Sequence, residues 1–95
     1  MNLGKVVGTV VSTRKESVLD GIRFLLVRLV DTDGKETPSF VVAADAMGAG
    51  PGEMVLTAAG SSARQTTLTQ NKPVDAVILA IVDTWDIDGK TKYTK

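Results

Sequence analysis

The 95-residue sequence contains no cysteine and no histidine. Without cysteine, disulfides and thiolate metal sites are excluded. Without histidine, the chain lacks the commonest general base and the commonest ligand of transition metals. Aromatic residues make up only 4% of the chain, whereas small barrels that bind single-stranded nucleic acids stack bases on several aromatic side chains along a basic groove. We therefore expect no metal, no cofactor and no enzymatic chemistry.

The sequence also has no excess of charge of either sign, with 11 Lys and Arg residues against 11 Asp and Glu residues. The basic residues are scattered, whereas a nucleic-acid-binding face gathers them into a patch or stripe. The first residues, MNLGKVVGTVV, are too short and too alternating for a signal peptide, and no apolar run approaches the length of a membrane span. We expect a cytosolic protein with neither a nucleic-acid partner nor a membrane partner.

Hydrophobic residues, by contrast, are abundant for so short a chain, at 43%. A domain of this size buries only about 60 to 65% of the surface that its unfolded chain exposes. The apolar surplus must be covered elsewhere, and a partner subunit is the simplest cover. Composition thus predicts a single small domain over residues 1–95 that forms an oligomer.

Five segments are rich in Val, Ile, Leu and Phe and are separated by turn residues, which is typical of β-strands. They are residues 4–13, 22–30, 38–44, 53–60 and 75–85. Asp33-Gly34 predicts a hairpin with a type I′ turn, and a turn at residues 87–89 would bring the tail back as a short sixth strand. Helix is scarce: one short helix is expected from Ser61 or Ser62, capped by a serine hydroxyl. The pattern predicts an all-β fold, a small closed or nearly closed five-stranded barrel with one short helix between strands four and five.

The second and fifth segments are apolar on both faces. Residues 22, 24, 26 and 30 would share one face, with residues 25, 27 and 29 on the other, and residues 77–82 repeat the pattern. In a small barrel the inner face fills the core, so an apolar outer face predicts a subunit interface. The alternative is that these are β-favouring residues left partly exposed, because much folded surface is apolar in any case.

The glycine-rich segment GAGPG, residues 48–52, raises the question of phosphate binding. Its spacing is G-x-G-x-G rather than G-x-G-x-x-G, no Gly-Lys-Ser/Thr follows, and a strand-like run stands where the phosphate cradle needs a helix N-terminus. An architectural role for Gly48, Gly50 and Gly52, as residues of a tight connection, is favoured instead.

The segment GSSAR, residues 60–64, raises the question of a serine nucleophile. It is not the G-x-S-x-G elbow, and no histidine exists to activate Ser61 or Ser62; a pairing with Lys72 is the remaining catalytic option, with helix capping as the alternative. Arg64 is the best candidate for anion binding, although a single arginine more often ties a loop to a neighbouring carboxylate or carbonyl.

Most of the chain resembles a known family, the EutN/CcmL vertex proteins of bacterial microcompartments. The resemblance is carried by VVAADAMGAGPGEMVLTAAGSSAR at residues 41–64, by VDAVILAIVD at residues 74–83 and by the opening MNLGKVVGTVVST. It implies an OB-like five-stranded barrel, assembled as a homopentamer that caps the vertices of a polyhedral shell in the bacterial cytoplasm, with hexameric shell proteins as partners. A small-anion-binding oligomeric barrel with no shell role is the alternative.

Nine residues are candidates for a role in this assembly. Small side chains suit a close approach of five chains, so Gly60, Ser61 and Ser62 are predicted to rim the five-fold opening. Arg64, Asp45 and Glu53 are predicted at the subunit interface. Gly48, Gly50 and Gly52 form the loop of the family motif.

Overall fold

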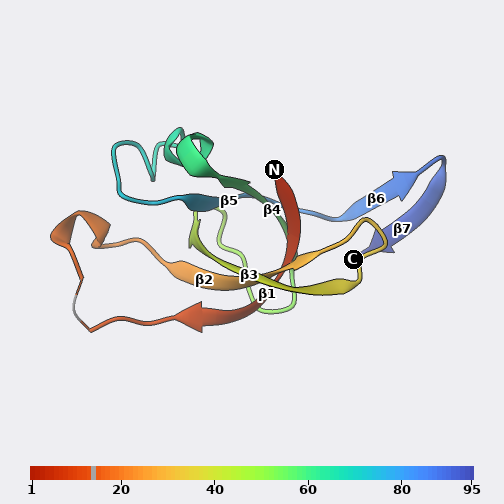
Figure 1. The fold of residues 1–95 in the computed structure, drawn as a ribbon, viewed down its shortest axis with the longest axis horizontal. Coiled ribbons are helices and arrows are strands. Elements are labelled where there is room, and N and C mark those ends of the chain that lie inside the picture. Colours follow the sequence, from red (N-terminus) through yellow and green to blue (C-terminus); the bar gives the residue numbers. More distant parts are fainter. Residues whose placement is uncertain (14) are drawn as a thin grey trace.

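The computed structural model describes residues 1–13 and 15–95, and the regular structure in this part of the chain is β-strand apart from two short 3₁₀ helices (Figure 1). The strands are β1 (Asn2–Val10), β2 (Phe24–Val30), β3 (Glu36–Asp45), β4 (Met54–Ala59), β5 (Ala76–Ile81), β6 (Thr84–Ile87) and β7 (Lys90–Thr94). Two short 3₁₀ helices join them, η1 (Ser17–Leu19) between β1 and β2 and η2 (Gly60–Arg64) between β4 and β5. The expected all-β fold with one short helix between the fourth and fifth strands is confirmed.

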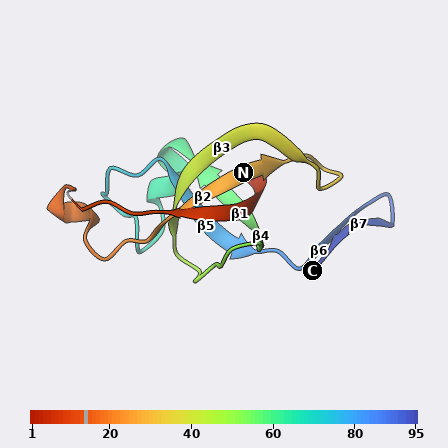
Figure 2. The ribbon, with the colours of Figure 1, turned by 90° about the horizontal axis from the view of Figure 1, so that it is seen from below.

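The first five strands close into a barrel in the order β1-β2-β3-β5-β4 (Figures 1 and 2). All neighbours are antiparallel except β3 and β5, which run parallel. The β3–β5 pairing is also the shortest: Ala44 faces Val77 and Asp45 faces Ile78. We call this two-pair contact the seam of the barrel.

The barrel interior is filled by aliphatic side chains from the inward faces of the strands. Leu25, Val27, Val55 and Ile78 are fully buried, and each such side chain stabilises the fold by roughly 1.5–3 kcal/mol relative to its exposed state. A second cluster lies under η2, where Ala63 packs among Ala44, Ala58, Val74 and Val77. Small alanines in this cluster let the short helix close one end of the barrel.

The segment at residues 75–85 was expected to form one strand, and this was wrong. The chain leaves the barrel after Ile81, and β6 pairs only with β7, in a separate two-stranded sheet that projects from the barrel (Figure 1). The C-terminal tail does return as a short strand, as predicted, but this strand is β7 and it does not join the barrel. Trp85 stacks on Tyr93 with ring centroids 4.9 Å apart, and its indole N–H donates to the Thr32 carbonyl at 2.8 Å. Beyond Val82 the apolar run gives way to Asp83, Thr84, Trp85 and Asp86.

The type I′ turn was also predicted at the wrong hairpin. Such a turn requires positive φ at both central residues. At the β2–β3 connection only Gly34 has positive φ, 81°, and its N–H donates to the Asp31 carbonyl at 3.0 Å. At the tip of the β6–β7 hairpin both Asp88 and Gly89 have positive φ, 51° and 76°. Aspartate followed by glycine occurs at both turns, so the dipeptide alone could not distinguish them.

Serine capping of the short helix was wrong as well. The residue before η2 is Ala59, and no side chain caps the helix. Ser61 and Ser62 lie inside the 3₁₀ turn and are exposed. The C-terminal part of η2 is held instead by Thr69, whose hydroxyl donates to the Ala63 carbonyl.

Candidate functional site

Asp45, the last residue of β3, organises the glycine-rich loop that follows it. Its Oδ1 atom accepts the backbone N–H groups of Met47 at 3.0 Å, Gly48 at 3.0 Å and Ala49 at 3.2 Å. An aspartate whose side chain accepts the next backbone amides is a common way to turn a chain sharply. Asp45 thus ends the strand and begins the connection to β4.

Glu53 fixes the other end of the same loop. Its Oε1 atom accepts the Gly50 N–H at 2.6 Å, and its Oε2 atom lies 3.0 Å from the Nζ atom of Lys95. The Gly50 N–H and then the Lys95 ammonium lower the pKa of Glu53 against the opposing effect of desolvation, and the same ion pair raises the pKa of Lys95. The carboxylate is therefore held ionised at neutral pH.

The N–H groups of residues 47–50, four in succession, are all donated to these two carboxylates. A phosphate cradle needs such amides free to point at the ligand, so the loop does not form one. Gly48 and Gly52 have φ of 74° and 84°, a conformation that side-chain-bearing residues rarely adopt. These contacts and the positive φ of Gly48 and Gly52 are what an architectural role of GAGPG requires.

Arg23 also contacts Asp45, a contact that the sequence gave no reason to expect. Its Nη1 atom lies 3.5 Å from Oδ2 of Asp45, whose side chain is 2% exposed, while the Arg23 side chain is 57% exposed. The Asp45 N–H donates to the Arg23 carbonyl at 2.9 Å. The buried carboxylate is thus compensated by three amides and one partly solvated guanidinium, as a buried charge requires.

The residues of GSSAR lie at the opposite end of β4 from this loop. Gly60 has φ of 65° and donates its N–H to the Asp75 carbonyl at 2.8 Å. The Arg64 Nη1 atom donates to the Val74 carbonyl at 3.4 Å, which is the loop-tying role considered for a single arginine. The six residues of β4 separate Arg64 from Glu53. Asp45 lies nearer to η2, since its neighbour Ala44 packs in the same cluster as Ala63, but its carboxylate contacts Arg23 and the loop amides, whereas Arg64 contacts the Val74 carbonyl.

The part of the chain that the structure describes contains no group of side chains arranged to make or break a covalent bond. Within residues 1–13 and 15–95 there is no group of three acidic, histidine or cysteine side chains that could hold a metal ion. Over the same residues, no helix combines the length and the hydropathy needed to cross a membrane. The carboxylates of Asp45 and Glu53 serve the chain's own loop.

The fold is a small closed barrel in which two carboxylates hold one of its own connections and glycines with positive φ serve tight turns. The model of one protein family, described as ethanolamine utilisation protein EutN/carboxysome, matches residues 1–83. The chain belongs to this EutN/CcmL family. The match includes the whole barrel and ends before β6.

Individual relatives match over a longer range. The carboxysome shell vertex protein CcmL of Gloeobacter violaceus is 46% identical over the whole chain, which covers 95% of that protein. Its solved structure has a TM-score of 0.96 over 100% of this chain and 98% of the other. The structure of GrpN, a pentameric microcompartment shell protein from Rhodospirillum rubrum, is 42% identical with a TM-score of 0.85 over 92% of this chain and 99% of the other.

Proposed function

We propose that five copies of this chain form a ring that occupies the vertices of a bacterial microcompartment shell. The observation that carries the proposal is similarity over the whole chain, at 46% identity and a TM-score of 0.96, to a carboxysome shell vertex protein. The pentameric GrpN structure supports the number of subunits. The function is structural: the protein fills a position in the shell.

The finer details of this function are proposed on the same grounds. The neighbours of the ring in the shell are hexameric shell proteins, because flat sheets of hexamers need five-fold points to close into a polyhedron. Gly60, Ser61 and Ser62 rim the central opening, an arrangement supported by their exposure and small size. Arg64 reaches the neighbouring subunit, and so does the loop that Asp45 and Glu53 hold in shape.

The ring is tested by mass measurement in solution. The chain has a mass of 10.0 kDa, so light scattering or native mass spectrometry at low micromolar concentration should give five times that value. A stable monomer would contradict the proposal, and a six-fold mass would contradict its vertex role.

Shell closure is tested by co-expression with a hexamer-forming shell protein. With this chain present, electron microscopy should show closed polyhedral shells, and without it open sheets or tubes. The control is a variant that folds but does not form rings. Closed shells of the same shape with and without this chain would contradict the role at the vertices.

A further inference from the structure

One face of the barrel is apolar but uncovered in the single chain. The strand registers align Val10 with Phe24 and align Leu26 with Val42, while Phe40 lies opposite Arg28. Side chains alternate along a strand, so these residues point away from the interior that Leu25 and Val27 fill. We call Val10, Phe24, Leu26, Phe40 and Val42 the outer face of β1, β2 and β3.

The outer face is open to solvent to an unusual degree for its composition. Val10, Phe40 and Val42 are 41%, 45% and 46% exposed. Leu26 is partly exposed, and so is Phe24, which also packs against the cluster under η2. The expectation that both faces of the second strand are buried therefore holds within the single chain only for the inner face. Contiguous apolar surface of this kind marks an interaction site.

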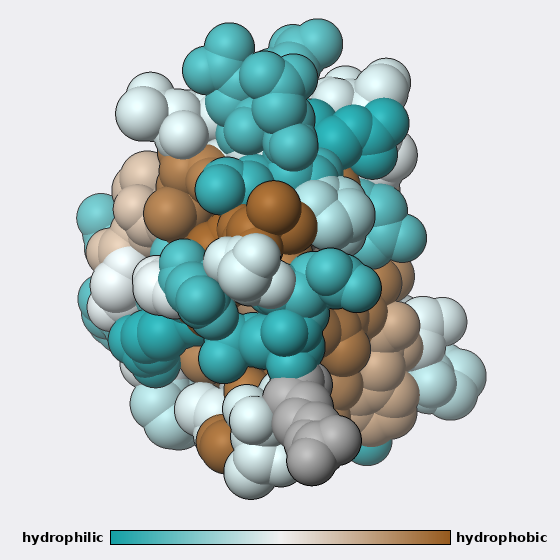
Figure 3. All heavy atoms as spheres, turned by 90° about the vertical axis from the view of Figure 1, so that its left-hand side faces the viewer, coloured by the Kyte–Doolittle hydropathy of each residue, from teal (hydrophilic) through white to brown (hydrophobic). Residues whose placement is uncertain are grey.

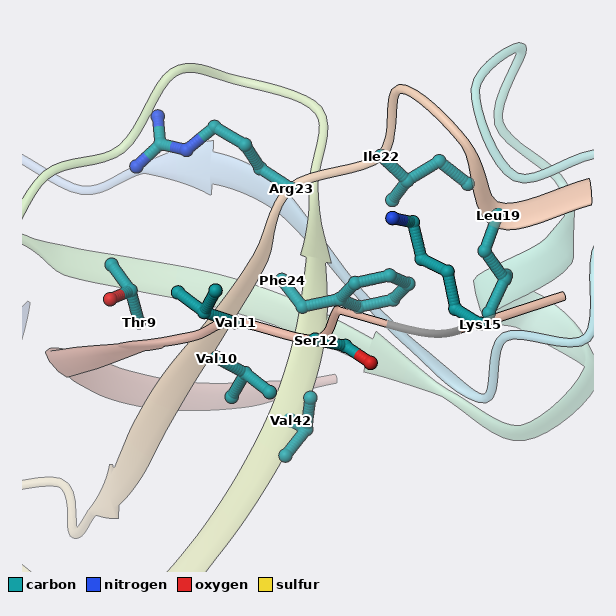
Figure 4. A pocket seen from close by; sticks show the side chains of 10 residues that line it. All are labelled: Thr9, Val10, Val11, Ser12, Lys15, Leu19, Ile22, Arg23, Phe24 and Val42. Carbon is teal, nitrogen blue, oxygen red and sulfur yellow. The ribbon is translucent and has the colours of Figure 1, made fainter. Parts of the chain in front are cut away.

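A hollow of about 580 Å³ adjoins the outer face where β1 ends. Val10, Phe24 and Val42 from three strands line it, together with Leu19 and Ile22 from the connection between β1 and β2 (Figure 4). Figure 3 looks on to this end of the molecule and shows apolar surface open between hydrophilic side chains. The outer face and the hollow form one surface.

Charged residues border this surface. The Arg28 guanidinium carbon lies 4.4 Å from the centroid of the Phe40 ring, and Lys5 is paired with Arg28 in the neighbouring strand. Lys15 and Arg23 stand at the hollow. An apolar centre containing aromatic residues, with arginine and a polar rim around it, is the usual anatomy of a protein–protein interface.

We infer that the neighbouring subunit of the ring packs on this surface. The inference rests on the proposed function and names the surface that it uses. Stable interfaces bury about 800 Å² on each partner, so a ring needs a concentrated apolar surface. Among the exposed large apolar residues of the described chain, Val7, Val10, Val11, Phe40 and Val42 belong to β1, β3 or the residue after β1, whereas Met1, Val18, Met47 and Ile87 are dispersed.

The barrel topology favours a second copy of this chain as the occupant. A head-to-tail ring requires each subunit to offer two unlike surfaces. The strand order puts β4 and β5 across the barrel from β2, and on that side Met1, Ser62 and Leu79 line a different hollow of about 320 Å³. Each copy thus carries two unlike hollowed surfaces on different sides of the barrel.

Substitution of Val42 by lysine tests the inference, with Ile87 as the matched control. Both are exposed aliphatic strand residues, 46% and 37% exposed, but Ile87 lies on the projecting hairpin. In light scattering at one micromolar concentration, the unmodified chain and Ile87→Lys should have the mass of a pentamer, and Val42→Lys that of a monomer. A pentamer of unchanged stability in Val42→Lys would overturn this inference and leave the proposed function standing. A monomeric unmodified chain would overturn both.

A milder variant covers the case in which Val42→Lys does not fold. Because the chain has no cysteine, Val42→Cys and Ile87→Cys each carry one thiol of nearly valine size, without background. In the ring, the thiol at position 42 should react with a maleimide roughly tenfold more slowly than the thiol at position 87, since it must wait for the interface to open. Equal rates in a preparation of pentameric mass would overturn the inference.

Discussion

Replacement of Asp45 by alanine should be among the most destabilising single changes in the chain. The Oδ1 atom accepts hydrogen bonds from three backbone N–H groups, and these groups differ in whether water can replace it as the acceptor. Those of Met47 and Gly48 belong to exposed residues and can turn to water, at about 0.5–1.5 kcal/mol each. Ala49 is 1% exposed, so its N–H is left unpaired, at about 1–3 kcal/mol. The Arg23 contact adds little, because that side chain is 57% exposed.

The expected total loss is about 2–6 kcal/mol for Asp45→Ala, and Asp45→Asn is its matched control. Asparagine keeps an acceptor oxygen for the three amides and loses only the charge, which roughly halves the strength of such hydrogen bonds, so a loss of about 1–2 kcal/mol is expected. Urea unfolding measures both values. The two variants and the unmodified chain must be compared at one chain concentration, because subunit association shifts apparent stability.

The ratio of the two losses decides whether the reasoning is sound. If the loop amides are what matter, alanine should cost at least twice as much as asparagine. Equal losses would mean that the charge near Arg23 carries the effect. A loss below about 0.5 kcal/mol for alanine, the range of an ordinary surface substitution, would refute the account of the loop altogether.

Two further changes test the barrel wall and the loop. Gly4→Ala should lower the free energy of unfolding by about 1–3 kcal/mol in thermal unfolding, because a Cβ at this position would collide with the Val27 side chain. Gly8→Ala in the same strand should cost much less, since the nearest atom to its Cβ would lie 3.9 Å away. Similar losses for the two variants would contradict the packing argument. Glu53→Gln should lower the unfolding midpoint at pH 7, and the difference should vanish in acid. The pKa of Glu53 is lowered in the folded chain, so its stabilisation is present above the ordinary glutamate range and is lost as the pH falls through the lowered pKa. A pH-independent difference would show that the charge of Glu53, which the Gly50 N–H and Lys95 stabilise, is not the cause.

The barrel could be predicted from the sequence because its signals are local. Runs of β-branched residues between turn residues indicate strands, and residues 22–30 are apolar at both odd and even positions, as in a strand with two apolar faces. The end of the barrel at Ile81 could not be predicted in the same way. Residues 75–85 form one strand-like segment in the sequence. In the structure the chain departs after Ile81, and Trp85 donates to the Thr32 carbonyl, a contact between residues 53 positions apart that no local pattern encodes.

The candidate site was predictable in its composition but not in its contacts. An aspartate before small residues and glycines indicates a loop held by its side chain, and Asp45 fulfils that pattern. Arg23, the partner of Asp45, lies 22 positions away in the sequence. Lys95, the partner of Glu53, lies 42 positions away. Such pairings depend on the register of strands that must already be in place, which no local pattern encodes.

The seam between β3 and β5 has a consequence for the order in which the molecule assembles. Strands β1, β2 and β3 follow one another in a meander and can pair early, since each closes only a short stretch of chain. The parallel pairing of Ala44 and Asp45 with Val77 and Ile78 must wait until β4, η2 and the polar segment after it have returned the chain. Asp45 is also the residue whose side chain turns the glycine-rich loop. We therefore expect barrel closure to be a late event, and nearly all of the outer face to be built before the barrel is shut. The hydrogen bonds that Asp45 accepts from the loop span only two to four positions and need not wait for that closure.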